Sequence, residues 1–255
     1  MIAGARIREW PAIALGLGTV LVVTLLVEAL VRAAIIDPYV VPLPSEVLAA
    51  FSRVIAEENV VARFLLTGGE TLAACLLLAG IGVPLGVLFY YAKILRAACE
   101  TWVAAMAAAP TVLMYPLFLV VFGRSSATIV AIGFVAALPA VILKTLEGLS
   151  ATPQVLLNVG KSLKLSGAQN FAMILFPSAL PSIFVGLRLG LVFALVNIVG
   201  VEFLINFGGL GQLVNELAER YDLPGMYAAI GFVILVSILV FFATERLESW
   251  LRRAR

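Results

Sequence analysis

Six apolar stretches run through this chain of 255 residues, and most of them are long enough to cross a lipid bilayer. A transmembrane helix needs about 20 apolar residues to cross roughly 30 Å of hydrocarbon. The predicted spans cover residues 12–33, 71–92, 102–122, 127–143, 183–204 and 226–244. We therefore predict an all-α integral membrane protein, with about six transmembrane helices in a single domain over residues 1–255.

The composition supports this class and excludes others. Hydrophobic residues make up 63% of the chain and charged residues 13%, which is more apolar surface than a water-soluble fold of this size can bury. The formal net charge is only +2, so we expect no nucleic-acid partner. The chain contains no histidine, so we expect no metal site and no catalytic residue. Cys75 and Cys99 lie in or beside apolar runs and are predicted to be free.

The basic residues predict how the chain sits in the membrane. Lys and Arg concentrate near the helix ends on the cytoplasmic side. With the N-terminus inside and six crossings, most of them, including Lys93, Lys161 and Arg252, share one side with both termini. This orientation makes the long segment 147–181 a cytoplasmic loop.

Segment 147–181 carries most of the functional information. Its pattern predicts a short amphipathic helix around Pro153–Leu163, a turn near Lys164–Gly167 and a second helix running to Pro177. An amphipathic helix between two spans either lies on the bilayer surface or docks on a partner. Its polar side offers only Lys161 and Lys164 to lipid headgroups, so docking on a protein is favoured.

The same segment resembles the EAA loop of the permease subunits of binding-protein-dependent ABC importers. Asn158-Val159-Gly160 stands in place of Glu-Ala-Ala, Lys164 stands in place of the usual glycine, and Ile174–Pro177 matches the Ile-x-Leu-Pro ending. The residues implied to contact an ATPase are Asn158, Val159, Gly160, Lys161, Ser162, Leu163, Lys164, Ser166, Phe171 and Pro177. Other stretches resemble the branch for nitrate, sulfonates and taurine: Pro42–Val47, Gly82–Gly86, Pro110 with Pro116, Glu202 and Gly209–Gly211.

The resemblance implies a permease of the bacterial inner membrane. It implies two permease copies, in this branch usually identical, two ATPase subunits that hold ATP and magnesium, and an external binding protein. The substrate would be a small anion of the sulfonate, taurine or nitrate kind, or alternatively a small heteroaromatic such as a pyrimidine precursor. Gly160-Lys161-Ser162 looks like the end of a phosphate-binding loop, but Val155 occupies the position of its first glycine. The chain is therefore not expected to bind a nucleotide or to be an enzyme. A stand-alone secondary transporter is the rival interpretation.

Charged residues inside spans are candidates for function. Arg188 is expected either to reach the cytoplasmic face or to line the pathway, and Glu202 either to tie its helix to the following loop or to touch the pathway. Gly208, Gly209 and Gly211 would form a re-entrant gate or a plain external loop. Glu28 and Arg32 are predicted to pair at i,i+4. Glu70 and Glu100 are predicted at the membrane interfaces.

Overall fold

The computed structural model describes residues 9–253, and all of its regular structure is helical. Its helices are α1 (Glu9–Arg32), α2 (Pro44–Glu57), α3 (Val60–Leu77), η1 (Leu78–Gly82), α4 (Val83–Tyr91), α5 (Lys93–Ala108), η2 (Thr111–Met114), α6 (Tyr115–Phe122), α7 (Ser126–Ser150), α8 (Gln154–Ser162), α9 (Gly167–Asn170), η3 (Phe171–Leu175), α10 (Phe176–Ile205), α11 (Gly209–Glu219) and α12 (Leu223–Arg253). Five helical stretches are long and apolar enough to cross a membrane, or up to six if a bent pair counts as one span. The predicted all-α membrane class is confirmed.

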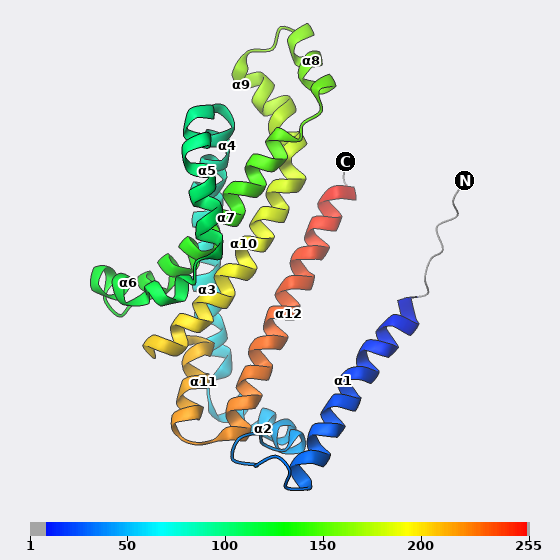
Figure 1. The fold of residues 1–255 in the computed structure, drawn as a ribbon, viewed down its shortest axis with the longest axis vertical. Coiled ribbons are helices and arrows are strands. Elements are labelled where there is room, and N and C mark those ends of the chain that lie inside the picture. The colour runs from blue at the N-terminus through cyan, green and yellow to red at the C-terminus, as the bar shows by residue number, and fades with distance from the viewer. Residues whose placement is uncertain (1–8, 254–255) are drawn as a thin grey trace.

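Helices α7 and α10 form the centre of the bundle and pack closely along their lengths (Figure 1). Small residues permit this approach. A Cβ added to Gly133 would lie 2.7 Å from the Ile198 side chain, and one added to Gly190 would lie 2.8 Å from Val141. Around these contacts lies the main apolar core, which includes Ile129, Ile132, Ala137, Ala194 and Val201.

Gly82 and Gly86 permit a second close helix contact. Gly86 lies so close to α7 that a Cβ there would be 2.6 Å from the Thr145 side chain and 2.9 Å from the Ile142 carbonyl. A Cβ on Gly82 would be 3.1 Å from Val141. The pair therefore seats η1 and α4 directly on α7.

The second span begins earlier than the sequence predicted. The helical stretch covers Val60–Tyr91 rather than 71–92, because its first turns pack against α11 and α12 around Val60. Glu70, predicted at an interface, lies inside this helix and is only 4% exposed. Helix α5 begins at Lys93, directly after this stretch.

The third span is broken, whereas the sequence predicted a continuous helix over 102–122. Helices α5 and η2–α6 meet at an angle of 96°. Pro110 lacks an amide proton and pushes the residue before it out of helical geometry, and Ala109 indeed has φ −74° and ψ 136°.

The fourth and fifth spans are longer than predicted. Helix α7 extends over Ser126–Ser150 instead of 127–143, and a helical stretch over Gly167–Ile205 replaces the predicted span 183–204. The two helices predicted within the segment 147–181 are present, but the second does not end at Pro177 and continues into α10. The glycines at 208, 209 and 211, expected to form a re-entrant gate or a plain external loop, lead directly into α11.

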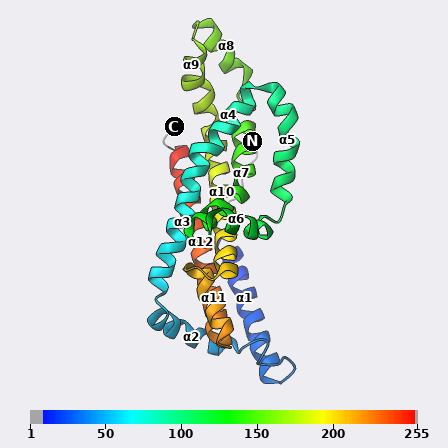
Figure 2. The same cartoon turned by 90° about the vertical axis from the view of Figure 1, so that its left-hand side faces the viewer.

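The bundle has two distinct ends (Figure 1 and Figure 2). Helices α8 and α9 project from one end, and α2 and α11 gather at the other. The start of α1 and the end of α12 point toward the α8 end. Helix α1 stands apart from the bundle, and only 6% of its apolar window is buried.

Candidate functional site

Helix α8 projects from the bundle (Figure 1), and several of its apolar side chains are exposed. Val155 is 71% exposed and Leu163, which follows the helix, is 66% exposed. Leu156 and Val159 are exposed beside them, as are Asn158, Lys161 and Ser162. A face of this kind, held outside the bundle, is suited to contact a partner protein.

The opposite face of α8 is fixed to the chain itself. A Cβ at Gly160 would lie 2.4 Å from the Asn170 Oδ1 atom and 2.8 Å from Ile174. Leu157 packs against the cluster around Leu175. Glycine is required at position 160 because α8 and the α9–η3 stretch touch there, so the two helices form one unit.

The turn between α8 and α9 has two local features. Lys164 has φ +53°, the left-handed conformation that favours glycine. This explains why the resembling loops carry glycine at the position of Lys164. Ser166 then starts α9 with a capping box: its Oγ accepts from the Gln169 amide at 3.3 Å, and its own amide donates to Gln169 Oε1 at 2.9 Å.

A Lys164→Gly variant is expected to be slightly more stable than the wild type. A left-handed conformation costs an L-residue about 1–2 kcal/mol, and the added freedom of glycine in the unfolded chain costs about 0.4–1 kcal/mol. The net gain raises the unfolding midpoint by about 2 °C, measured by thermal unfolding in detergent. The matched control is Lys161→Gly inside α8, which should lose about 1 kcal/mol. A lower midpoint for Lys164→Gly than for Lys161→Gly would contradict this account.

Phe171 and Pro177 connect the projecting pair to the bundle. The Phe171 ring lies 6.3 Å from the Tyr91 ring and 5.7 Å from the Phe176 ring. Pro177 stands in the first turn of α10, directly after the π-helical stretch η3. A displacement of α8 would therefore pass directly into α10 and the end of α4.

Glu202 anchors α11 to α10 at the other end of the molecule. This carboxylate is fully buried; one oxygen accepts from the Thr67 hydroxyl at 2.7 Å and the other from the Gly211 amide at 2.8 Å. The Thr67 hydroxyl also accepts from the Leu210 amide at 2.9 Å. The carboxylate thus satisfies donors at the start of α11, where the helix dipole favours negative charge. Of the two roles predicted for Glu202, the tie to the Gly-rich segment is confirmed.

The three glycines form the turn that brings α11 back onto α10. Gly208 and Gly209 have φ of +70° and +76°. A Cβ on Gly209 would lie 2.1 Å from the Glu202 carboxylate, and one on Gly211 would lie 2.1 Å from the Val199 carbonyl. Side chains are excluded here because the turn wraps tightly around Glu202.

Arg188 lies against α12. Its guanidinium carbon is 5.4 Å from the centre of the Phe241 ring, a cation–π contact. Nine residues of α-helix, at about 100° each, place Arg188 and Asn197 on opposite faces of α10. The structure therefore does not bring Arg188 together with Glu202, the Gly-rich turn or Asn197.

Two polar residues at the break in the third span were missed in the sequence. The Thr111 hydroxyl donates to Asn197 Oδ1 at 2.9 Å, and both residues line a cavity beside the break. The available signals were an amide inside an apolar span and a threonine directly after Pro110. Their proximity could not be predicted, because 86 positions separate them.

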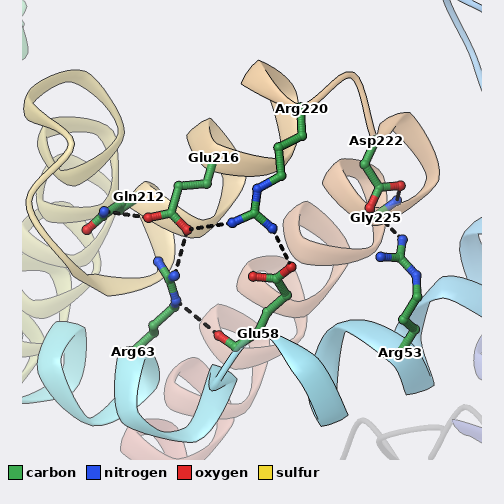
Figure 3. A network of polar contacts seen from close by, with 8 residues as sticks. All are labelled: Arg53, Glu58, Arg63, Gln212, Glu216, Arg220, Asp222 and Gly225. Carbon is green, nitrogen blue, oxygen red and sulfur yellow. Dashed lines mark hydrogen bonds and ion pairs between the residues drawn. The ribbon is translucent and has the colours of Figure 1, made fainter.

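A charged network joins α2, α3, α11 and the start of α12 (Figure 3). Arg63 bonds Glu216 at 2.6 Å and the Glu58 carbonyl at 3.1 Å, and Arg220 bonds the Glu58 carboxylate at 2.8 Å. Arg53 pairs with Asp222, and this hydrogen bond raises the pKa of Arg53. Single exposed ion pairs contribute little, but together these fix α2 on α11. The predicted pair Glu28–Arg32 is confirmed at 2.7 Å.

The long apolar helices, the projecting helix pair and the anchored far end define a polytopic membrane transport subunit. The chain belongs to the family described as "Binding-protein-dependent transport system inner membrane component", which matches residues 79–253. This confirms the resemblance found in the sequence. The family is that of a transport permease component.

Relatives that are named for particular substrates match between 66% and 94% of this chain. The taurine transport system permease protein TauC of Escherichia coli (strain K12) is 24% identical, over 94% of this chain and 90% of its own. The nitrate import permease protein NrtB of Synechocystis is 29% identical, over 67% of this chain and 62% of its own. The formylaminopyrimidine transport permease protein ThiX of Halalkalibacterium halodurans is 27% identical over 66% and 68%. A chain of the MetNI methionine ABC transporter in an inward-facing conformation shares the fold, with a TM-score of 0.66 at 21% identity over 74% of this chain and 94% of that one.

Proposed function

We propose that this permease docks α8 onto a separate ATPase subunit and moves a substrate delivered by an external binding protein. The observation that carries the proposal is the outward apolar face of α8, with Val155 and Leu163 largely exposed at the end of the bundle. The partner binds ATP and magnesium, and closure of two such ATPases moves α8. Because Gly160 holds α8 against Asn170, the movement passes through η3 into α10.

The orientation follows from the same proposal. The α8 end is cytoplasmic, and the start of α1 and the end of α12 point to that side (Figure 1). The network of Arg53, Arg63 and Arg220 then faces outward, where the binding protein arrives. The membrane is the inner membrane of a bacterium.

A second copy of the chain completes the pathway. Helices α5 and α6 contain no buried residue, and their apolar side chains include Trp102 at 75% and Val120 at 85% exposure. In one copy alone these side chains face lipid or open space. A homodimer that pairs these helices across the pathway covers them, with two ATPase subunits below it.

The proposed substrate is a small anion of the taurine, sulfonate or nitrate kind, as the names of TauC and NrtB suggest. A small heteroaromatic is the second candidate, supported by ThiX and by the uncharged lining of the cavity at the break. Selection among these compounds rests largely with the binding protein.

Co-purification from native membranes in mild detergent tests the proposal. We expect an ATPase subunit in equal number with the permease, identified by mass spectrometry, and uptake that stops when ATP is depleted while the ion gradient is kept. A chain that purifies without an ATPase, and whose uptake survives ATP depletion, is a secondary transporter instead.

A further inference from the structure

A cavity of about 300 Å³ lies at the break in the third span. It is bounded by the end of α5, the start of η2, and one face each of α7 and α10. Its lining includes Ala107, Pro110, Thr111, Ala136, Phe193 and Asn197. Non-helical backbone inside a membrane is tolerated where it lines a cavity, and such broken helices are where transporters bind substrate groups.

The polar groups of this cavity are arranged around Asn197. Its Oδ1 accepts from the Thr111 hydroxyl at 2.9 Å, and its Nδ2 donates to the Phe193 carbonyl at 2.8 Å. Oδ1 has a second lone pair, which can accept from a ligand. Thr111 is only 8% exposed, so its hydrogen bond to Asn197 is sheltered from solvent. The orientation of the Asn197 amide is therefore set before a ligand enters.

The break adds backbone acceptors to the same cavity. In a continuous helix the Thr111 amide would bond the Ala107 carbonyl, but here it bonds the Ala109 carbonyl at 2.8 Å. The Met106 carbonyl, which meets no amide proton at Pro110, accepts from the Ala109 amide at 3.2 Å, so the Ala107 carbonyl is the acceptor that the break frees. The last carbonyls of α5 also form the negative end of that helix dipole. The cavity is therefore richer in acceptors than in donors.

The charge of the lining decides which ligands fit. No ionisable side chain lines this cavity among the described residues. A bare anion would lose its water there without a cation to replace it, which is costly. An ammonium or amino group of a ligand instead meets the backbone carbonyl oxygens and the Asn197 side-chain oxygen. The apolar or flat part of the same ligand contacts Phe193 and the alanines of the lining.

We propose that this cavity is a substrate-contact site inside the membrane for a small molecule that carries an N–H donor group. The cavity fits the amino group of an amino-substituted heteroaromatic ring, or that of an aminoalkyl sulfonate whose sulfonate stays outside the cavity, and it disfavours nitrate. Asn197 is the residue that contacts the donor group, and Thr111 positions it. The inference rests on the proposed transport function and narrows its substrate.

The test measures uptake into intact cells of a strain that lacks this gene and carries it on a plasmid, so that the binding protein and the ATPase are both present. The probes are labelled taurine, labelled 4-amino-2-methylpyrimidine and labelled nitrate. We expect ATP-dependent uptake of one of the two amines in preference to nitrate. Asn197→Leu should lower that uptake about 10-fold, since the acceptor for the ligand's donor group is removed, and Thr111→Val should lower it less, because it leaves the amide in place.

The matched control is Asn215→Leu on α11, where the amide donates to Glu219 far from the cavity; its uptake should equal that of the wild type. All variants are checked for equal amounts in the membrane and for equal thermal midpoints. Preference for nitrate, no uptake of either amine, or an Asn197→Leu uptake within twofold of the wild type would each overturn the inference. Uptake of an amine that is sensitive to Asn197 but survives ATP depletion would instead overturn the proposed ABC mechanism and leave the site standing.

Discussion

A Val155→Glu variant is expected to lose ATP-driven uptake by about 30- to 1,000-fold while the permease remains folded in the membrane. Val155 is among the most exposed apolar side chains on α8, and it touches no part of the core clusters. A carboxylate placed in the centre of a protein interface must be desolvated, and the loss of a central contact costs about 2–4 kcal/mol, which is the free energy of a 30- to 1,000-fold effect.

Two measurements separate this effect from misfolding. The ATPase should no longer co-purify with Val155→Glu, whereas the variant's own thermal midpoint should match the wild type. The matched control is Val40→Glu, the same change at a 64% exposed valine between α1 and α2, at the other end of the molecule. Normal uptake by Val155→Glu, or an equal loss of uptake in Val155→Glu and Val40→Glu, would contradict the assignment of α8 as the docking surface.

Replacing Glu202 by alanine is expected to destabilise the protein by about 3 kcal/mol or more, because two buried donors lose their acceptor and a cavity remains. The donors are the Gly211 amide and the Thr67 hydroxyl. Without the Glu202 carboxylate, the glycine turn and the start of α11 lose their attachment to α10. Thermal unfolding in detergent and proteolysis of the α10–α11 connection both report this change.

Glu202→Gln is the conservative partner of that experiment. The side-chain oxygen of Gln can still accept from one donor, and removal of the charge relieves the electrostatic repulsion between residue 202 and Glu70. We therefore expect the free energy of unfolding to fall by about 1 kcal/mol or less. Thr67→Val should cost roughly 1–3 kcal/mol. Combined with Glu202→Ala it should cost less than the sum, since both belong to one network. Additive losses, or a Gln variant as unstable as the Ala variant, would contradict the anchoring role.

The class of the protein was predictable from hydropathy alone, but the helix ends were not. Hydropathy measures how well a segment fits lipid, and Val60–Gly69 is helical for a different reason, namely its packing on α11. Three of the prolines in the spans illustrate the same limit. Pro139 lies buried within an unbroken α7 and Pro181 within α10, whereas Pro110 breaks its span. Neighbouring helices re-satisfy the backbone around some prolines, and the sequence does not show which ones.

The functional sites were predictable in so far as they are local. The helix–turn–helix of α8 and α9 lies where its amphipathic pattern indicated. The tie between Glu202 and Gly211 spans nine positions and was among the predicted alternatives. The contact between Thr111 and Asn197 was not, because it depends on the break at Pro110. The π-helical turns η1 and η3 also limit what the sequence predicts. Each turn shifts the faces of a helical wheel by about 100°, so residues after it lie on a different face from the one the pattern indicates.

Helix α1 divides the chain into parts with very different tolerance for mutation. Its apolar side chains meet few protein neighbours, and its end is fastened to α2 by hydrogen bonds from Ser45 to Glu28. Any residue that partitions into lipid can stand at most of its positions, so random substitution there is largely neutral provided length and hydropathy persist. On α7 and α10 even one added methyl group meets an occupied position, as at Gly133 and Gly190. The first span can therefore diverge freely in sequence while the central pair stays constrained.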